Sequence, residues 1–146
     1  MAVDHIRELM QYEEAMFGSE SWSAAAYREE LADRRHRYYV VALADDDALL
    51  GWAGLRVLSD EAEVLTIGVA PAARRQGVGS TLLHELLDEA RRRRARTVFL
   101  DVRVDNDDAQ RIYIREGFAA IGVRRGYYDN GRTDSLTMSL ALDLAS

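Results

Sequence analysis

A loop rich in arginine and glycine carries the residue types best suited to hold an anion. Arg74 and Arg75 supply guanidinium donors that match phosphate oxygens, while Gly77 and Gly79 lack the Cβ atom that would keep a ligand away from the backbone. The apolar run 64–69 precedes the loop, and leucines at helical spacing follow it. The first N–H groups of a helix have no intrahelical partner and lie at its positive end. The stretch is therefore predicted to be a strand, a tight loop and a helix N-terminus that can bind an anion.

Two familiar phosphate-binding loops do not fit this stretch. A Walker A loop needs a lysine, and all 19 basic residues of the chain are arginine. The dinucleotide-binding pattern needs a third glycine where Leu82 stands. Taken alone, the loop is compatible with an anion site and equally with a glycine-rich turn that binds nothing.

The pattern Arg74-x-x-Gly77-x-Gly79, which follows a predicted strand and Pro71, resembles the pyrophosphate loop of the GNAT family, the acetyl-CoA-dependent N-acetyltransferases. In that family, successive N–H groups of the loop hold the pyrophosphate of coenzyme A. The main chain of the preceding strand holds the pantetheine arm and the acetyl carbonyl. The resemblance implies acetyl-CoA as a co-substrate and assigns its binding to Ile67, Gly68, Val69, Arg74, Arg75, Gln76, Gly77, Val78, Gly79, Ser80 and, further along the chain, Asn106.

Four later motifs, at 100–106, 111–118, 122–128 and 129–134, narrow the resemblance to the RimI-type branch of the family, the ribosomal-protein-alanine N-acetyltransferases. That branch implies acetyl transfer to a protein N-terminal α-amine. The expected acceptor is the N-terminal alanine of small-subunit ribosomal protein eighteen. Two alternatives stay open: a GNAT enzyme for small amines such as polyamines or aminoglycosides, and a coenzyme A-binding module without turnover.

The resemblance also assigns the catalytic groups. Asp101 stands where the branch has a glutamate, so it is the expected base for the acceptor amine, with Glu63 on the neighbouring strand as a second candidate. Tyr113 matches the acid that the family uses for the departing thiolate. Each group has a structural alternative, because Asp101 could pair with an arginine and Tyr113 could be a core aromatic residue.

Three aromatic residues, Trp22, Tyr127 and Tyr128, are candidate walls for the acceptor, with ordinary packing as the alternative. The resemblance implies that a main-chain N–H near Val69 donates to the oxyanion. The chain has no cysteine and no Gly-x-Ser-x-Gly motif, so direct transfer in a ternary complex is predicted.

Composition limits the remaining classes of protein, partner and location that the chain could belong to. A chain of 146 residues with 48% hydrophobic content suggests one domain, 1–146. The absence of cysteine excludes disulfides and thiolate metal ligands, and no metal site is expected. No apolar run reaches the length of a membrane span, so we expect a cytoplasmic protein without a membrane partner. The net charge of −6 disfavours nucleic acid and favours a basic acceptor. A monomer or weak dimer is expected.

Periodicity and turn signals predict a mixed α/β fold, with a mostly antiparallel central sheet and helices on both faces. The expected helices are 4–17, 23–33, 77–94 and 107–116, with Asp4, Ser23 and Asn106 as N-caps. The expected strands are 37–43, 48–58, 61–69, 96–103, 118–128 and 133–144. The GNAT fold usually opens with a strand before its first helix, and only residues 1–3 stand there, so that first strand is expected to be missing.

Overall fold

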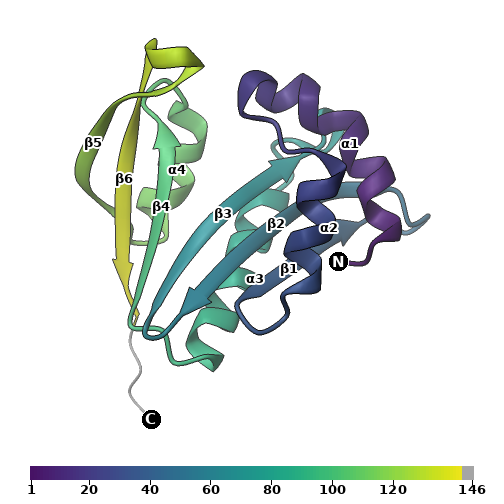
Figure 1. The fold of residues 1–146 in the computed structure, drawn as a ribbon, viewed down its shortest axis with the longest axis horizontal. Coiled ribbons are helices and arrows are strands. Elements are labelled where there is room, and N and C mark those ends of the chain that lie inside the picture. Colours follow the sequence, from purple (N-terminus) through teal and green to yellow (C-terminus); the bar gives the residue numbers. More distant parts are fainter. Residues whose placement is uncertain (143–146) are drawn as a thin grey trace.

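A computed structural model of the chain describes residues 1–142. Its centre is a six-stranded sheet with the order β1-β2-β3-β4-β6-β5 (Figure 1). The strands are β1 (Arg37–Leu43), β2 (Leu49–Leu58), β3 (Glu61–Val69), β4 (Thr97–Arg103), β5 (Ala119–Tyr128) and β6 (Thr133–Ala141). The helices are α1 (Asp4–Phe17), α2 (Ala24–Ala32), α3 (Val78–Arg92) and α4 (Asp107–Arg115). Short 3-10 turns form η1 (Gly18–Glu20), η2 (Pro71–Ala73) and η3 (Asp129–Gly131).

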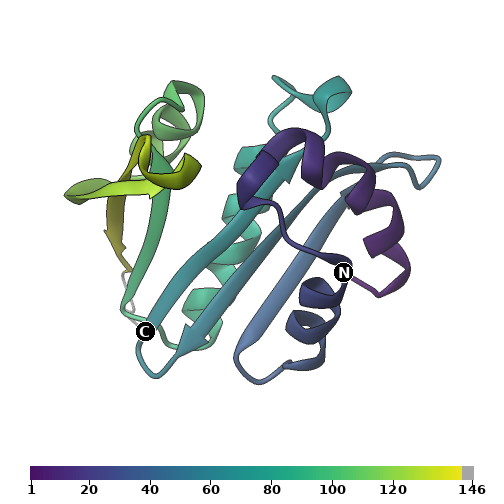
Figure 2. The same cartoon turned by 45° about the horizontal axis from the view of Figure 1, so that its top comes forward.

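Helices cover both faces of the sheet, as predicted. α1 and α2 lie over one face of β1 to β3, and α3 lies over the opposite face (Figures 1 and 2). All paired strands are antiparallel except β3 and β4. The mostly antiparallel mixed sheet expected from the sequence is therefore confirmed.

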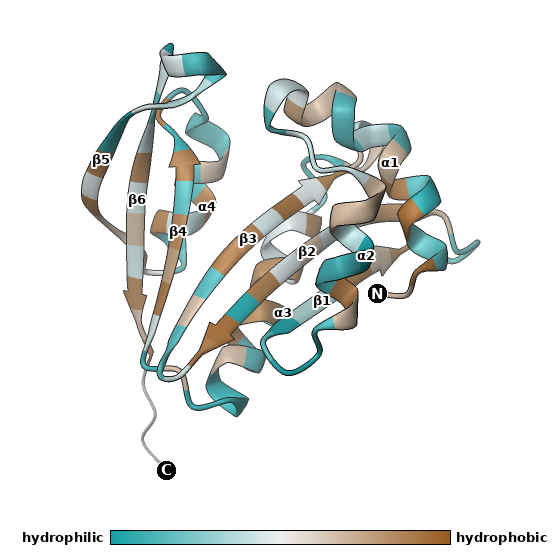
Figure 3. Cartoon of the chain, viewed as in Figure 1, coloured by the Kyte–Doolittle hydropathy of each residue, from teal (hydrophilic) through white to brown (hydrophobic). Residues whose placement is uncertain are grey.

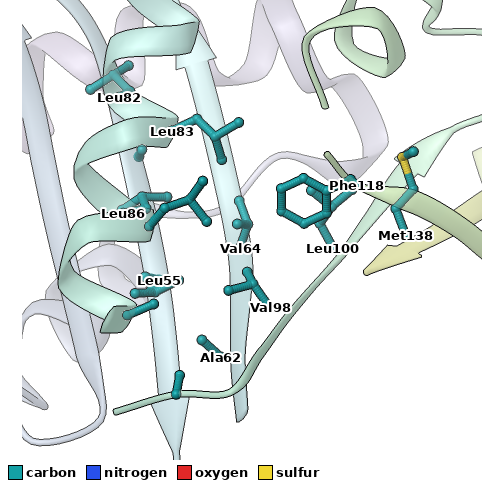
Figure 4. Packing of buried hydrophobic residues seen from close by; sticks show 14 of the residues in the cluster. Leu55, Ala62, Val64, Leu82, Leu83, Leu86, Val98, Leu100, Phe118 and Met138 are labelled. Atoms are coloured by element: carbon teal, nitrogen blue, oxygen red, sulfur yellow. The ribbon is translucent and has the colours of Figure 1, made fainter. Parts of the chain in front are cut away.

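The main core lies between α3 and the sheet. Side chains alternate along a strand, so Val98, Leu100 and Val102 of β4 all point to the α3 side, where they are buried. The leucines of α3 at helical spacing, including Leu83 and Leu86, pack in the same cluster (Figure 4). Apolar residues gather along the strands, while hydrophilic residues follow the loops and outer helix surfaces (Figure 3). This packing fixes the start of α3 against the end of β3.

β3 and β4 are neighbours only where they begin. Residues 61–63 pair with 97–99, and beyond that point the two strands diverge (Figure 1). Gly54 of β2 pairs with Thr66 and Leu55 pairs with Val64, which leaves Leu65 of β3 as an unpaired bulge. A bulge bends its strand and increases the local twist. The bend at Leu65 follows directly after the last β3–β4 pair, and it accounts for the separation of the two strands.

Several local details refine the sequence prediction. Asp4 is not the N-cap of α1, because Val3 occupies that position and Asp4 is the first helical residue, where its charge faces the positive helix end. Ser23 and Asn106 do cap α2 and α4 through their side chains. The predicted last strand reaches residues 143 and 144, which lie outside the described residues.

No strand precedes α1 within residues 1–142, and β1 lies at an edge of the sheet, paired with β2 alone. None of the helices in this part of the chain has the length and apolar character needed to cross a bilayer.

Candidate active site

Loop 74–77 turns the chain from η2 into α3. Arg75 and Gly77 have φ angles of 65° and 80°, in the left-handed region that glycine adopts without strain. Gly77 is the N-cap of α3, and no side chain caps this helix end. Throughout residues 1–142, no backbone hydrogen bond involves the N–H groups of residues 75–80. The loop therefore presents a row of consecutive free donors.

The electrostatic field around these donors is positive. α3 is 15 residues long and has no acidic residue in its first turn, so its dipole leaves a positive end at the loop. Arg74, Arg75 and Gln76 are exposed beside it, and Ser80 is partly exposed within the first helical turn. A Cβ atom at Gly77 would meet nothing within 4 Å. The loop is open to a ligand, and it combines the kinds of donor that can bind an anion.

Ile67, Gly68 and Val69 form the end of β3, immediately before η2. One edge of this segment pairs with β2. The other edge has no pairing with β4, because β4 has diverged by this point. Gly68 is required by packing, since a Cβ atom there would lie 2.4 Å from the Trp52 ring. The strand that the resemblance assigns to acetyl-CoA thus has one edge available for a ligand.

Asp101 lies on β4 and points to the sheet face opposite α3. Its Oδ1 atom accepts hydrogen bonds from the hydroxyls of Thr137, at 2.7 Å, and Ser135, at 3.2 Å. The Nε atom of Arg124 lies 3.4 Å from the same oxygen. The Asp101 side chain is 12% exposed and lines a hollow of about 220 Å³. The pairing with an arginine considered from the sequence does occur, but the two hydroxyls are the closer partners.

Glu63, the second candidate base, lines the same hollow from β3. Its Oε1 atom forms an ion pair with Arg56 of β2, at 3.0 Å. Because β2 and β3 are antiparallel and these residues are directly opposite, the pair spans adjacent strands. Glu63 is thus held by a cation on its own half of the sheet, while Asp101 lies on the other side of the gap.

Tyr113 lies on α4, on the face of the sheet opposite to Asp101, and packs edge-on against Phe118 with ring centroids 5.9 Å apart. Burial raises the pKa of Tyr113 to about 12, with a smaller contribution from Tyr128. No described residue hydrogen-bonds its hydroxyl, and the fully buried side-chain polar atoms in residues 1–142 all have partners. The hydroxyl is therefore not completely enclosed, while the ring packs against the core. The two interpretations made from the sequence are compatible.

The predicted aromatic walls lie on two loops that meet across the open end of the strand gap. Trp22 follows η1, and Tyr127 and Tyr128 end β5. The Asp129 N–H donates to Glu20 Oε1 at 2.8 Å and so joins the two loops. Tyr127 is 50% exposed, and burial raises the pKa of Tyr128, opposed by a hydrogen bond with Ser135. The loop that carries Trp22 is thus joined to the end of β5, while the Trp22 ring itself packs against Tyr27, with ring centroids 5.1 Å apart.

Each loop is fixed by one charged side chain. Glu13 of α1 is 1% exposed; it accepts from the Tyr27 hydroxyl and, at 3.2 Å, from the Trp22 N–H. On the other loop, Arg103 binds Asp129 at 2.6 Å. The pKa of Arg103 is raised by this hydrogen bond and by a second one with Asp105. Hydrogen bonds to Glu13 and Arg103 therefore hold the two loops, in addition to apolar packing.

Asn106 is a helix cap: its Oδ1 atom accepts from the Ala109 N–H at 3.1 Å. This leaves the amide nitrogen of its side chain as a donor for a ligand. Within residues 1–142, no three or more histidine, aspartate or glutamate side chains gather in a way that could hold a metal ion.

Several residues that hold this site are not among those predicted from the sequence. Glu13 carried a signal, because it stands one helical turn after Leu9 on the buried stripe of α1, where an acidic residue is unusual. Hydroxyl residues alternate with apolar residues along β6, but the face they share with Asp101 depends on the β4–β6 pairing. The missed residues are Glu13, Glu20, Arg103, Ser135 and Thr137.

Comparison with known proteins gives a consistent result. The sequence profile described as Acetyltransferase (GNAT) family matches residues 6–118. The N-alpha-acetyltransferase RimI of Mycobacterium tuberculosis is 43% identical over 125 residues, which cover 83% of this chain and 76% of that protein. The ribosomal protein bS18-alanine N-acetyltransferase of Escherichia coli K12 is 33% identical, over 84% of this chain and 82% of that protein. The crystal structure of the ribosomal-protein-S18-alanine N-acetyltransferase from Escherichia coli matches with a TM-score of 0.86 and 27% identity, over 100% of this chain and 93% of that chain.

Proposed function

This chain belongs to the acetyltransferase (GNAT) family, and we propose that it acetylates the N-terminal alanine of a ribosomal protein of the bS18 type. It is an acetyl-CoA-dependent N-acetyltransferase. The observation that carries the proposal is the row of free N–H groups at residues 75–80. This row follows the end of β3, where β3 and β4 are no longer paired. The names of the relatives supply the acceptor.

The residues of loop 74–77 fit the pyrophosphate of acetyl-CoA. Consecutive free N–H groups, a helix N-terminus and two arginines are the donors that such an anion needs. In this proposal the unpaired edge of 67–69 holds the pantetheine arm, and an N–H near Val69 stabilises the oxyanion. Bound acetyl-CoA supplies the acetyl thioester. The side-chain amide of Asn106 completes the proposed cofactor contacts.

Asp101 is the proposed base. A protein α-amine has a pKa of about 7.7–8.0, so near neutral pH much of the acceptor arrives as ammonium and must lose one proton. Asp101 takes that proton, directly or through a water molecule. The neutral nitrogen then attacks the acetyl carbonyl and the new C–N bond forms. As the C–S bond breaks, the nitrogen loses its second proton to solvent, which leaves a neutral amide and the coenzyme A thiolate. Glu63 is the less suitable base, because Arg56 already holds its carboxylate.

Tyr113 is the proposed donor to the leaving thiolate. Its pKa of about 12 keeps the phenol protonated at neutral pH. Full transfer to a thiolate, whose thiol has a pKa of about 8.5, would be uphill by roughly 5 kcal/mol. Tyr113 is therefore expected to stabilise the thiolate as a hydrogen-bond donor, and the thiol gains its final proton from solvent.

In this proposal, aromatic side chains of the two joined loops contact the acceptor. Trp22 lies on one loop, Tyr127 and Tyr128 lie at the end of β5, and the hydrogen bond between Asp129 and Glu20 joins the two. A net charge of −6 favours a basic protein as the partner. Polyamines and aminoglycosides are also cations, so the preference for a protein N-terminus rests on the names of the relatives.

The proposal is tested by following coenzyme A thiol release with three acceptors in parallel. They are a basic peptide that begins with alanine, a polyamine, and no acceptor at all. We expect turnover with the peptide alone. Turnover with the polyamine and not the peptide would contradict the proposed acceptor. Tight acetyl-CoA binding without any turnover would contradict catalysis altogether.

A further inference from the structure

One oxygen of Asp101 carries every protein contact of its carboxylate that the described residues make. The hydroxyls of Thr137 and Ser135 and the Nε atom of Arg124 all converge on Oδ1. We propose that Thr137 and Ser135 are positioning residues, which hold the Asp101 carboxylate by Oδ1 and leave Oδ2 for the acceptor amine. This inference rests on the proposed function, in which Asp101 is the base.

The pairing of β4 with β6 places these hydroxyls. Asp101 is directly opposite Thr137, and Arg103 is directly opposite Ser135. Because side chains alternate along a strand, both hydroxyls share the sheet face of the Asp101 carboxylate, one beside it and one on the diagonal. An aspartate side chain is short, so its carboxylate lies close to the sheet, within reach of the short side chains of serine and threonine.

Burial shields these contacts from water. Ser135 is 0% exposed, so no water can replace Asp101 as the hydrogen-bond partner of its hydroxyl. The Thr137 hydroxyl makes the shortest contact, at 2.7 Å, and Thr137 lines the same hollow as Asp101. Arg124 is the weakest of the three partners, because its side chain is 55% exposed and its Nε atom lies at 3.4 Å. Thr137 is therefore the principal positioning residue, Ser135 the second, and Arg124 the least important.

The arrangement has a chemical consequence. Donors on Oδ1 hold negative charge on that oxygen and fix the rotation of the carboxylate. The remaining oxygen, Oδ2, then presents its lone pairs in one direction, which is what a base needs in order to take one proton from an ammonium group. Without the two hydroxyls, the short side chain would rotate freely and productive orientations would be rarer.

The experiment compares substitutions at Thr137 that differ only in the hydroxyl. Thr137→Val keeps the shape and removes the donor, whereas Thr137→Ser keeps the donor. Ser139→Ala is the matched control: Ser139 lies two residues further along the same face of β6 and pairs with Phe99. For each variant, kcat and the acceptor KM are measured with an alanine-initiated basic peptide, together with acetyl-CoA affinity.

We expect Thr137→Val to lower kcat by roughly ten- to a hundredfold, the effect of losing one hydrogen bond to a charged group. Acetyl-CoA affinity and acceptor KM should change by less than about twofold, because Thr137 is not among the residues proposed to contact acetyl-CoA or the acceptor. Thr137→Ser and Ser139→Ala should stay within about threefold of wild type. Ser135→Ala should lower kcat by a smaller factor than Thr137→Val.

A double substitution separates positioning from general destabilisation. In an Asp101→Asn background, Thr137→Val should have no further effect on kcat, because there is no base left to position. Full additivity of the two substitutions, or a kcat for Thr137→Val equal to that of wild type, would overturn the inference while leaving the proposed function intact. Absence of wild-type turnover with the peptide would instead overturn the proposed function, and this inference with it.

Discussion

The substitution Glu13→Ala should strongly destabilise the protein. The carboxylate of Glu13 is 1% exposed and accepts two hydrogen bonds, from the Tyr27 hydroxyl and the Trp22 N–H. The Tyr27 hydroxyl in turn accepts from Trp52 Nε1 at 3.1 Å. Glu13 therefore ties α1 to α2, to the segment that carries Trp22 and, through Tyr27, to the centre of β2.

The magnitude follows from the groups left behind. A buried donor without a partner costs roughly 1–3 kcal/mol, and Glu13→Ala leaves two of them. Trp22 is partly exposed, so water can satisfy part of its N–H, while Tyr27 is buried and cannot recover in this way. A loss of about 3–4 kcal/mol is therefore expected, which lowers the midpoint of thermal unfolding by roughly 10 °C in a domain of this size.

Urea unfolding of wild type, Glu13→Ala and Glu14→Ala measures this directly. Glu14 is the next residue of α1 and is exposed, so its substitution should change the free energy of unfolding by less than about 0.5 kcal/mol. If Glu13→Ala also unfolds within about 1 kcal/mol of wild type, Glu13 does not anchor the segment that carries Trp22.

Four further predictions follow from the same contacts. Burial raises the pKa of Glu13, so folding favours its protonated form. The stability of wild type relative to Glu13→Gln should therefore be greatest below about pH 4.3 and should decline as the pH rises through the raised pKa. Urea titrations at several pH values would measure this decline. Tyr113→Phe should slow thiol release by roughly ten- to a hundredfold without weakening acetyl-CoA binding, and unchanged release would remove Tyr113 as the donor to the thiolate. Glu63→Gln should keep turnover with the peptide within about threefold of wild type, whereas a loss as large as that of Asp101→Asn would make Glu63 the base. Gly68→Ala should cost roughly 1–3 kcal/mol of folding free energy in thermal unfolding, because the new Cβ atom would meet the Trp52 ring; a stability equal to wild type would show that the ring can move aside.

Features encoded by neighbouring residues could be predicted from the sequence. The strand, loop and helix around Gly77 depend on periodicity, on one proline and on glycines, all within about one segment of chain. Ser23 and Asn106 were recognisable as caps for the same reason. The order of helices and strands, and the mixed sheet, followed from these local signals.

Features that depend on how distant segments meet could not be predicted. Leu65 is a bulge because of its pairing with β2, and no composition signal marks it. The contact of Glu20 with Asp129 joins residues 109 positions apart, and that of Asp101 with Thr137 joins residues 36 positions apart. Such contacts follow from sheet order and register, which a single sequence does not specify.

The position of the transferred acetyl group distinguishes an N-terminal acetyltransferase from a lysine acetyltransferase. A basic peptide that begins with alanine and also contains an internal lysine is incubated with the protein and acetyl-CoA, and fragment masses then locate the modification. The account predicts acetylation of the α-amine of alanine, and none on the lysine side chain. Acetylation of the lysine in place of the terminus, or an unmodified peptide with intact acetyl-CoA, would contradict it.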